Sequence, residues 1–155
     1  MSKVARSARV GSRQRIEVVN DDKTLTQAES GETYFVRDDL NEYNRAIQIT
    51  LPTPETGSYF KFIMTDGDAG LELTGSSTYR VLGHATQLMG SGSVGGRNRV
   101  IVPPGTETAT ASTTVFQLPL SASVGSWVEC VSDGQTWFVH AQVSGVLPVF
   151  RGTND

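Results

Sequence analysis

The sequence has little cysteine, no long hydrophobic run and almost no helical patterning. Its one cysteine, Cys130, excludes an internal disulfide and a zinc site built from cysteines. No run of about 18 apolar residues is present, which excludes a transmembrane helix. The first 15 residues lack an apolar segment, so we expect no secretory signal. Apolar residues do not recur at helical spacing over three turns anywhere, which argues against a helical fold.

Charged residues are also scarce, at 19 % of 155 residues, and the hydrophobic fraction is only 37 %. Glycine, serine and threonine take their place, and this composition favours strands and turns. The length suits one domain with arms. We therefore predict an all-β fold: an antiparallel β-sandwich, or a small jelly roll or barrel, of about nine short strands.

Residues 46–65 are predicted to supply the core. The apolar residues Ile47, Ile49 and Leu51 alternate with polar ones, which is the pattern of a half-buried strand. After a break at two prolines and a glycine, residues 59–64 form a second strand with apolar side chains on both faces. Because such a strand needs cover on both sides, we expect the rest of the chain to close around this pair.

Two patterns predict the conformation of segments outside this core. The stretch Thr26-Gln-Ala-Glu29 matches a capping box, so we expect one helical turn that ends at Gly31. Residues 83–98 are rich in glycine with scattered apolar residues, which indicates a long irregular loop. We expect this loop to become ordered only on contact with a partner.

Residues 126–143 predict a hairpin, because Asp133-Gly134 is a strong turn signal between two alternating stretches. In the first stretch, Val128 and Cys130 share the inward face, so Cys130 is expected to be a small buried residue rather than a nucleophile. One face of the second stretch carries Trp137, Val139, Ala141 and Val143.

The two ends of the chain differ from the middle. Five basic residues precede all 16 acidic residues, which predicts a basic arm over residues 1–22 that either docks on an acidic partner or stays soluble and unstructured. The body, residues 23–143, is too acidic to bind nucleic acid itself. The apolar tail, residues 144–155, is expected to pack on the body or, by preference, on a neighbouring subunit. The basic residues of the arm are Lys3, Arg6, Arg9, Arg13 and Arg15.

Several motifs suggest chemistry but lack the context that the chemistry needs. Gly90-x-Gly92-x-x-Gly95 spells the dinucleotide fingerprint, yet a predicted strand follows it instead of a helix. Asp66, Asp68 and Glu72 suggest a calcium loop, but the glycine and glutamate required at its sixth and twelfth positions are missing. We therefore expect solvated carboxylates in a turn, and no cofactor or metal.

The histidines and tryptophans also point to structural roles. His84 and His140 are far apart in sequence, and no G-x-S-x-G motif places a serine beside either of them. Trp127 and Trp137 are typical of core or subunit-interface positions, although aromatic side chains exposed on a sandwich also bind sugars. We find no catalytic constellation and predict that the protein is not an enzyme.

Four motifs are spread over roughly residues 25–140: Leu25-Thr-Gln-Ala-Glu-Ser-Gly31, Ile47-x-Ile-Thr-Leu-Pro52, Gly57-x-x-Phe60-Lys-Phe62-Ile63 and Val131-Ser-Asp-Gly-x-x-Trp137. Together they resemble the motifs of small β-rich virion proteins of tailed bacteriophages. The motifs are turn and core patterns, so they are specific for the fold and weak for the role.

The resemblance implies a capsid decoration (cement) protein, made in the host cytoplasm and located on the outer surface of the phage head. Its implied partners are the major capsid protein and its own copies in a homotrimer, with no nucleic acid bound directly and no membrane. The alternative is a tail or fibre module that binds host-surface polysaccharide. We expect the basic arm to contact the shell, and the expected subunit contacts are Arg97, Arg99, Leu147, Val149 and Phe150.

Overall fold

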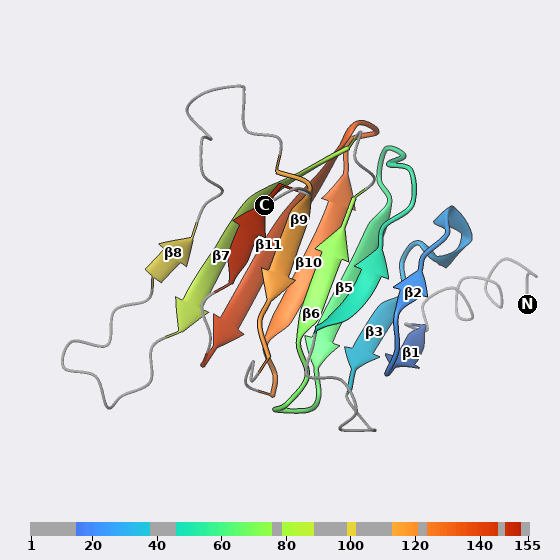
Figure 1. The fold of residues 1–155 in the computed structure, drawn as a ribbon. Coiled ribbons are helices and arrows are strands. Elements are labelled where there is room, and N and C mark those ends of the chain that lie inside the picture. Colours follow the sequence, from blue (N-terminus) through green and yellow to red (C-terminus); the bar gives the residue numbers. More distant parts are fainter. Residues whose placement is uncertain are drawn as a thin grey trace, which may run out of the picture.

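The protein is a β-sandwich of two stacked sheets (Figure 1). The computed structural model describes residues 15–37, 46–75, 79–88, 99–101, 113–120, 124–145 and 148–152. In spatial order, the seven-stranded sheet contains β1 (Ile16–Val19), β3 (Thr33–Val36), β5 (Tyr59–Met64), β10 (Trp127–Ser132), β11 (Thr136–Ser144), β7 (Arg80–Leu88) and β8 (Arg99–Ile101). The five-stranded sheet contains β12 (Val149–Arg151), β9 (Val115–Leu118), β6 (Leu71–Thr74), β4 (Ile47–Thr50) and β2 (Lys23–Thr24).

The sandwich prediction is confirmed, and within the described residues neither sheet closes into a barrel. The expectation of purely antiparallel sheets is wrong, because both sheets are mixed. From β1 to β7 each successive strand enters the opposite sheet. A strand that returns to its sheet after such an excursion runs in its original direction. This explains why β1, β3 and β5 pair in parallel, as do β2, β4 and β6.

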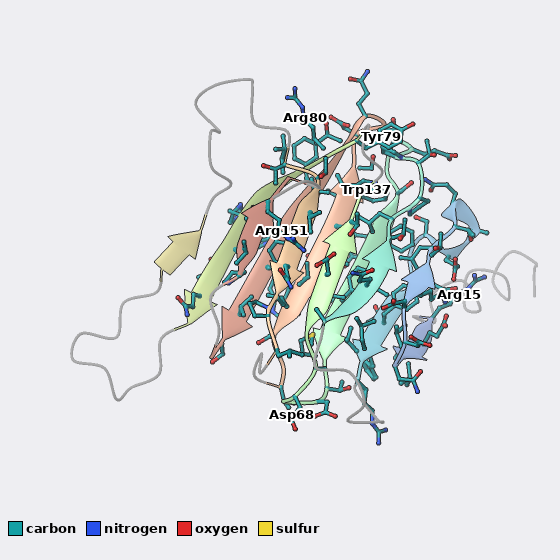
Figure 2. All side chains as sticks on the ribbon, viewed as in Figure 1. Arg15, Asp68, Tyr79, Arg80, Trp137 and Arg151 are labelled. Atoms are coloured by element: carbon teal, nitrogen blue, oxygen red, sulfur yellow. The ribbon has the colours of Figure 1, made fainter. Side chains whose placement is uncertain are left out.

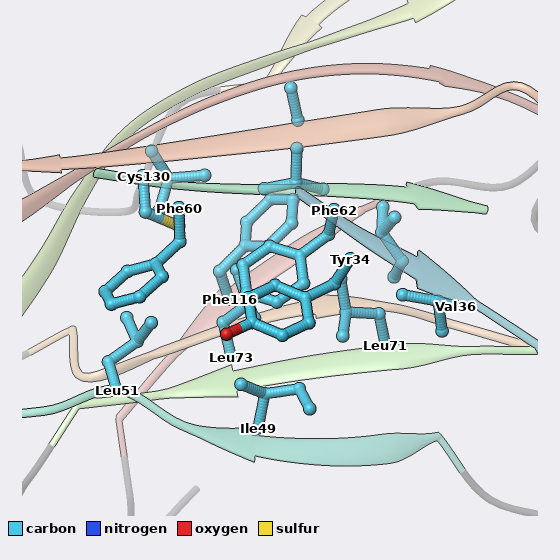
Figure 3. Close-up of a cluster of buried hydrophobic side chains, with 14 of the residues drawn as sticks. Tyr34, Val36, Ile49, Leu51, Phe60, Phe62, Leu71, Leu73, Phe116 and Cys130 are labelled. Carbon is cyan, nitrogen blue, oxygen red and sulfur yellow. The ribbon is translucent and has the colours of Figure 1, made fainter. Parts of the chain in front are cut away.

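The core lies between the sheets and includes Ile47, Ile49, Leu51, Phe60, Phe62 and Met64 from the stretch 46–65. The expected cover on both faces of residues 59–64 is wrong, because Tyr59 and Ile63 are only half-buried and lie on the side of the sheet that faces away from the core. Strands β4 and β5 belong to different sheets, so their apolar faces meet across the core (Figure 3). Tyr34 stacks on Phe62 with ring centroids 5.4 Å apart. Trp137, whose Nε1–H donates to the carbonyl oxygen of Pro52 at 3.1 Å, lies 5.7 Å from the Phe60 ring. The largest fully buried side chains are Trp137, Tyr34, Phe60, Phe62, Phe116, Leu25, Ile49, Met64, Leu71, Leu73, Leu118 and Val36.

The helical turn predicted before Gly31 and the hairpin predicted over residues 126–143 are both present. A 3₁₀ turn, η1 (Gln27–Glu29), follows Thr26, whose backbone N–H and hydroxyl both donate to the Glu29 carboxylate. Gly31 ends the turn with φ of 94°. Strands β10 and β11 form the expected hairpin, and Val128, Cys130 and the predicted face of β11 are buried.

The sandwich extends into both predicted end segments. Strand β1 lies within the predicted arm, residues 1–22, and β12 lies within the predicted tail, residues 144–155. Strand β7 likewise occupies the first part of the predicted loop 83–98 and continues to Leu88, so that part of the prediction is wrong. His84, Ala85 and Thr86 alternate in burial, as a strand with one solvated face requires. Residues 89–98 lie outside the described residues.

Candidate functional site

The outer face of the seven-stranded sheet is the candidate site. Side chains alternate between the two faces of a strand, and the strand register aligns the outward ones in rows. The central row is polar and is flanked by two rows with aromatic and aliphatic side chains. We define the outer face as the rows Lys61–Glu129–His140–His84, Tyr59–Val131–Phe138–Leu82 and Ile63–Trp127–Gln142–Thr86.

The polar row contains an ion pair held by neighbouring aromatic residues. Lys61 Nζ lies 2.9 Å from Glu129 Oε1, and the Tyr59 hydroxyl donates to the same oxygen at 3.1 Å. The hydrogen bond from Lys61 is the main cause that lowers the pKa of Glu129. Partial burial, followed by the hydrogen bond to Glu129, raises the pKa of Tyr59 to about 12. At neutral pH, therefore, the tyrosine is a donor and Glu129 is an anion.

The other end of the polar row brings the two histidines together. His84 on β7 and His140 on β11 are register partners, and their ring centroids are 4.6 Å apart. The ring of Trp127 meets His140 almost edge-on, at 5.2 Å and 86°. Both imidazoles are exposed. The sequence did not reveal their pairing, because parallel strands β7 and β11 become neighbours only in the folded sheet.

Gly83 explains how β7 comes so close to β11 beside the histidines. Its φ is 137°, in the region that favours glycine, and it pairs with Val139. A Cβ atom on Gly83 would lie 1.9 Å from the Val139 carbonyl oxygen, so no other residue fits this backbone. Glycine within a strand commonly marks such a close approach.

A shallow groove of about 480 Å³ opens on this part of the outer face. The polar row forms part of its lining, through Glu129 and both histidines. Aromatic and aliphatic side chains form the rest, so the groove offers stacking surfaces beside an anion and two imidazoles. Its lining residues are Tyr59, Gly83, His84, Glu129, Val131, Phe138, Val139 and His140.

The same side of the sheet carries several exposed apolar side chains. Val131 and Phe138 are 46 % and 41 % exposed. Register places Ile16 and Val18 of β1 on this side as well, where they are 55 % and 51 % exposed. These four are among the six large hydrophobic residues that are exposed in the described part of the chain. Val131 and Phe138 are register partners on β10 and β11, so they form one continuous exposed apolar area. Exposed apolar surface that is continuous and rimmed by polar residues is typical of interaction sites, so this side is suited to binding a partner.

The four predicted contact residues that the structure describes do not gather in one place. Arg15 lies at the β1 edge of the sandwich (Figure 2), where it is largely exposed and pairs with Glu32 at 3.5 Å. Arg99 begins β8, and Val149 is exposed on β12. The remaining predicted contacts in the arm and in the later segments lie outside the described residues: Lys3, Arg6, Arg9, Arg13, Arg97 and Leu147.

Phe150 is the exception among the predicted subunit contacts. It is only 5 % exposed, and its ring packs edge-to-face on Phe116 with centroids 4.9 Å apart. The preference for a neighbouring subunit is therefore wrong for this side chain, because strand β12 pairs with β9 and turns Phe150 into the core of its own chain.

Glu72 also departs from its prediction as a solvated carboxylate. It is buried on β6, and its Oε2 accepts a hydrogen bond from Arg151 Nη2 at 2.7 Å. This ion pair joins β12 to the sheet and was not apparent from the sequence.

Asp68 lies at the opposite end of the sandwich from Tyr79 and Arg80 (Figure 2), in the bend before β6.

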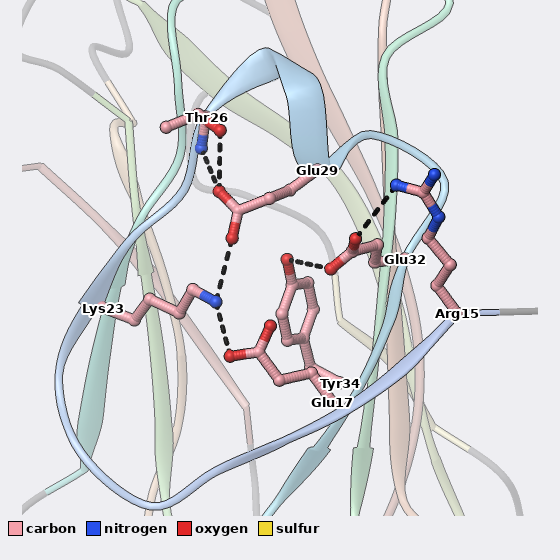
Figure 4. A network of polar contacts seen from close by, with 7 residues as sticks. All are labelled: Arg15, Glu17, Lys23, Thr26, Glu29, Glu32 and Tyr34. Carbon is pink, nitrogen blue, oxygen red and sulfur yellow. Dashed lines mark hydrogen bonds and ion pairs between the residues drawn. The ribbon is translucent and has the colours of Figure 1, made fainter.

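A second group of carboxylates, Glu17, Glu29 and Glu32, lies near β1 and η1 (Figure 4). Lys23 Nζ lies 2.6 Å from Glu17 and 2.9 Å from Glu29, while Arg15 pairs with Glu32. Because Lys23 and Arg15 already pair with all three carboxylates, we interpret the group as a structural network that ties β1, β2 and η1 together.

Across the described segments, no helix is long and apolar enough to cross a membrane. Comparison with known proteins yields no match to a protein-family model, to a curated protein or to a solved structure.

Proposed function

We propose that this chain is a non-catalytic virion protein of a tailed bacteriophage that decorates the outside of the head and stabilises the shell. The exposed pair Val131 and Phe138, flanked by half-buried aromatic and aliphatic side chains of the outer face, carries this proposal, since an exposed apolar surface suits a permanent contact in an assembly. The basic arm and the motif resemblance support it. The partners are the major capsid protein and other copies of the chain in a homotrimer, without direct contact to nucleic acid or membrane.

The stabilisation in this proposal is mechanical. A rigid sheet face that bridges neighbouring capsid subunits removes apolar surface from water, which contributes about 25 cal/mol per Å². Many copies on one shell add their contacts, and linked contacts bind more tightly than each contact alone. No bond is made or broken, so the protein needs only a well-packed body and a complementary surface.

Co-sedimentation with expanded, undecorated phage heads tests the proposal. The unmodified protein should saturate the heads at a fixed ratio to capsid subunits. The double variant Val131→Thr/Phe138→Thr should bind at least about tenfold more weakly, since threonine keeps the strand propensity but removes apolar area. Val124→Thr is the matched control, because Val124 is 64 % exposed but lies in the turn before β10.

The outcomes separate the parts of the proposal. Equal binding by both variants would show that the outer face is not the docking surface. Absence of binding by the unmodified protein would overturn the decoration function itself. Light scattering of the free protein then decides the oligomeric part of the proposal, since a homotrimer has three times the mass of one chain.

The groove favours one alternative, a tail or fibre module that binds host-surface polysaccharide. Phe138 and Tyr59 offer ring faces and edges, and Glu129 and the histidines offer hydrogen-bonding groups beside them. Sugars are commonly bound by such combinations of aromatic and polar groups. Binding to a glycan array without affinity for heads would support this alternative, and Phe138→Thr should then abolish the glycan signal.

A further inference from the structure

The two histidines of the outer face are also potential metal ligands, a chemistry that neither proposed function uses. They are the only histidines in the chain, and they lie side by side on β7 and β11 with ring centroids 4.6 Å apart. Imidazole nitrogen is a preferred ligand of zinc, copper and nickel, whereas calcium and magnesium prefer oxygen. The chemistry of the pair therefore selects a transition-metal ion.

The backbone under the pair is fixed. Gly83, next to His84, lets β7 approach the Val139 carbonyl more closely than any other residue would allow. On the neighbouring strand β11, the ring of His140 packs almost perpendicular to the ring of Trp127. Ligands held on adjacent strands, with one ring restrained by packing, lose little conformational entropy when they bind a metal ion.

Glu129 supplies a carboxylate on the far side of His140. The two residues are register partners on β10 and β11, and both line the groove. Lys61 and Tyr59, which face this carboxylate from β5, both contact its Oε1 atom. Lys61 is thus separated from His140 by Glu129 within the row. Carboxylates beside metal-binding histidines orient the imidazole and raise its basicity.

We propose that His84 and His140 bind one divalent transition-metal ion, Zn²⁺ in first place, with Glu129 as the positioning carboxylate and water filling the remaining coordination positions. The groove and the exposure of both imidazoles leave room for that water. The carboxylates near Lys23 are not an equivalent site, because they offer oxygen ligands without an imidazole, and oxygen ligands suit calcium and magnesium better than zinc. This proposal rests on the free protein and is independent of the proposed function.

Titration of the full chain with Zn²⁺, followed by NMR of the imidazole C–H groups, tests the proposal. Two histidines give two sets of signals, so the assignment needs only one variant. Both sets should shift and saturate at one ion per chain, EDTA should reverse the shifts, and Mg²⁺ should cause none. Unchanged signals at tenfold excess of Zn²⁺, or a shift of one histidine alone, would overturn the paired site.

Calorimetry with variants assigns the ligands. His84→Gln and His140→Gln should each weaken Zn²⁺ binding at least tenfold, and Glu129→Gln should weaken it about tenfold, as loss of an outer carboxylate does elsewhere. Glu17→Gln is the matched control at the other carboxylate group and should bind as tightly as the unmodified chain. A loss with Glu17→Gln but not with His84→Gln would overturn the assignment, and unchanged affinity in Glu129→Gln would overturn the part given to the carboxylate. Circular dichroism confirms that each variant keeps its β-sheet content.

Discussion

At the scale of single residues, burial decides the chemistry of Cys130. The side chain is fully buried on β10, opposite Phe60 of β5. Burial is the main cause that raises the pKa of its thiol, so the reactive thiolate is scarce as well as inaccessible. The sequence predicted this role from the inward face of the strand, and the structure confirms its burial.

We expect native Cys130 to be inert to a thiol reagent such as dithiobisnitrobenzoate at pH 8, and to react with one equivalent after unfolding in urea. The absorbance of the released thiolate measures the reaction. Rapid stoichiometric reaction of the native protein would show that β10 opens or that Cys130 is accessible.

Adding a single methyl group at Gly83 should lower the stability of the fold strongly. We expect Gly83→Ala to lower the free energy of unfolding by at least about 3 kcal/mol, because the new Cβ would collide with the Val139 backbone and φ is positive. Gly31→Ala is the matched control: φ is also positive, but no atom lies within 4 Å of its Cβ position. That variant should lose only about 1–2 kcal/mol. Equal losses in urea unfolding would contradict the close approach of β7 and β11.

At the scale of elements, the short strands are held not only by backbone hydrogen bonds to the next strand but also by ion pairs between side chains. Strand β2 is only two residues long, and Lys23 links it to Glu17 of β1 and Glu29 of η1 (Figure 4). Burial by itself would raise the pKa of Glu29, but hydrogen bonds from Lys23 and Thr26 outweigh burial and lower it. The folded state therefore favours ionised Glu29.

This preference predicts how stability depends on pH. A lowered pKa stabilises the fold above the unfolded value, near 4.5, and that contribution disappears as the pH falls through the folded value. Glu29→Gln should cost about 1 kcal/mol at pH 7, as loss of a cap does. The difference from the unmodified protein should shrink between pH 5 and pH 3. Urea unfolding over this range measures it, with exposed Glu55→Gln as control, and a constant difference would refute the linkage.

Strand β12 is three residues long and is also held by an ion pair. Arg151→Met should leave the buried Glu72 carboxylate without its charged partner and cost about 2 kcal/mol. The double variant Glu72→Gln/Arg151→Met should recover part of the loss, because it removes the unpaired charge. Thermal unfolding compares the unmodified protein, Glu72→Gln, Arg151→Met and the double variant. A loss in the double variant that equals the sum of the two single losses would contradict a direct pair.

At the scale of the whole molecule, the boundary between arm and body lies earlier than the sequence indicated. Strand β1 begins at Ile16, and the carbonyl oxygen of Arg15 accepts a hydrogen bond from the Thr33 N–H at 2.8 Å. A deletion of residues 1–16 would therefore cut into the seven-stranded sheet. Deletion of residues 1–14 separates the two parts.

We expect the free energy of unfolding of the protein without residues 1–14 to lie within about 0.5 kcal/mol of that of the full chain, since every described contact is kept. Its binding to undecorated heads should fall sharply, because four of the five basic arm residues are removed. Urea unfolding and co-sedimentation measure the two effects. Full saturation of heads by the shortened protein would refute the role of the arm.

The sequence alone determined the local features. Alternation of apolar and polar residues was sufficient to assign the inward faces of β4 and β10 and to group the side chains that share a face of β11, because side chains in a strand alternate irrespective of which strand lies beside it. It did not assign the inward face of β5, where apolar side chains lie on both faces. The turn at Asp133-Gly134 and the cap at Thr26 were equally predictable, since both depend on neighbouring residues only.

Only the tertiary structure decided which strands are neighbours. The chain passes from sheet to sheet up to β7, so neighbouring strands are often distant in sequence. Contacts between such distant segments include the parallel strand pairs, the His84–His140 contact, the Glu72–Arg151 ion pair and the packing of Phe150 on Phe116. Local sequence patterns do not predict such contacts, because strand order depends on how the apolar faces of two complete sheets pack together. The candidate site, built from side chains of four strands, is for this reason a property of the fold.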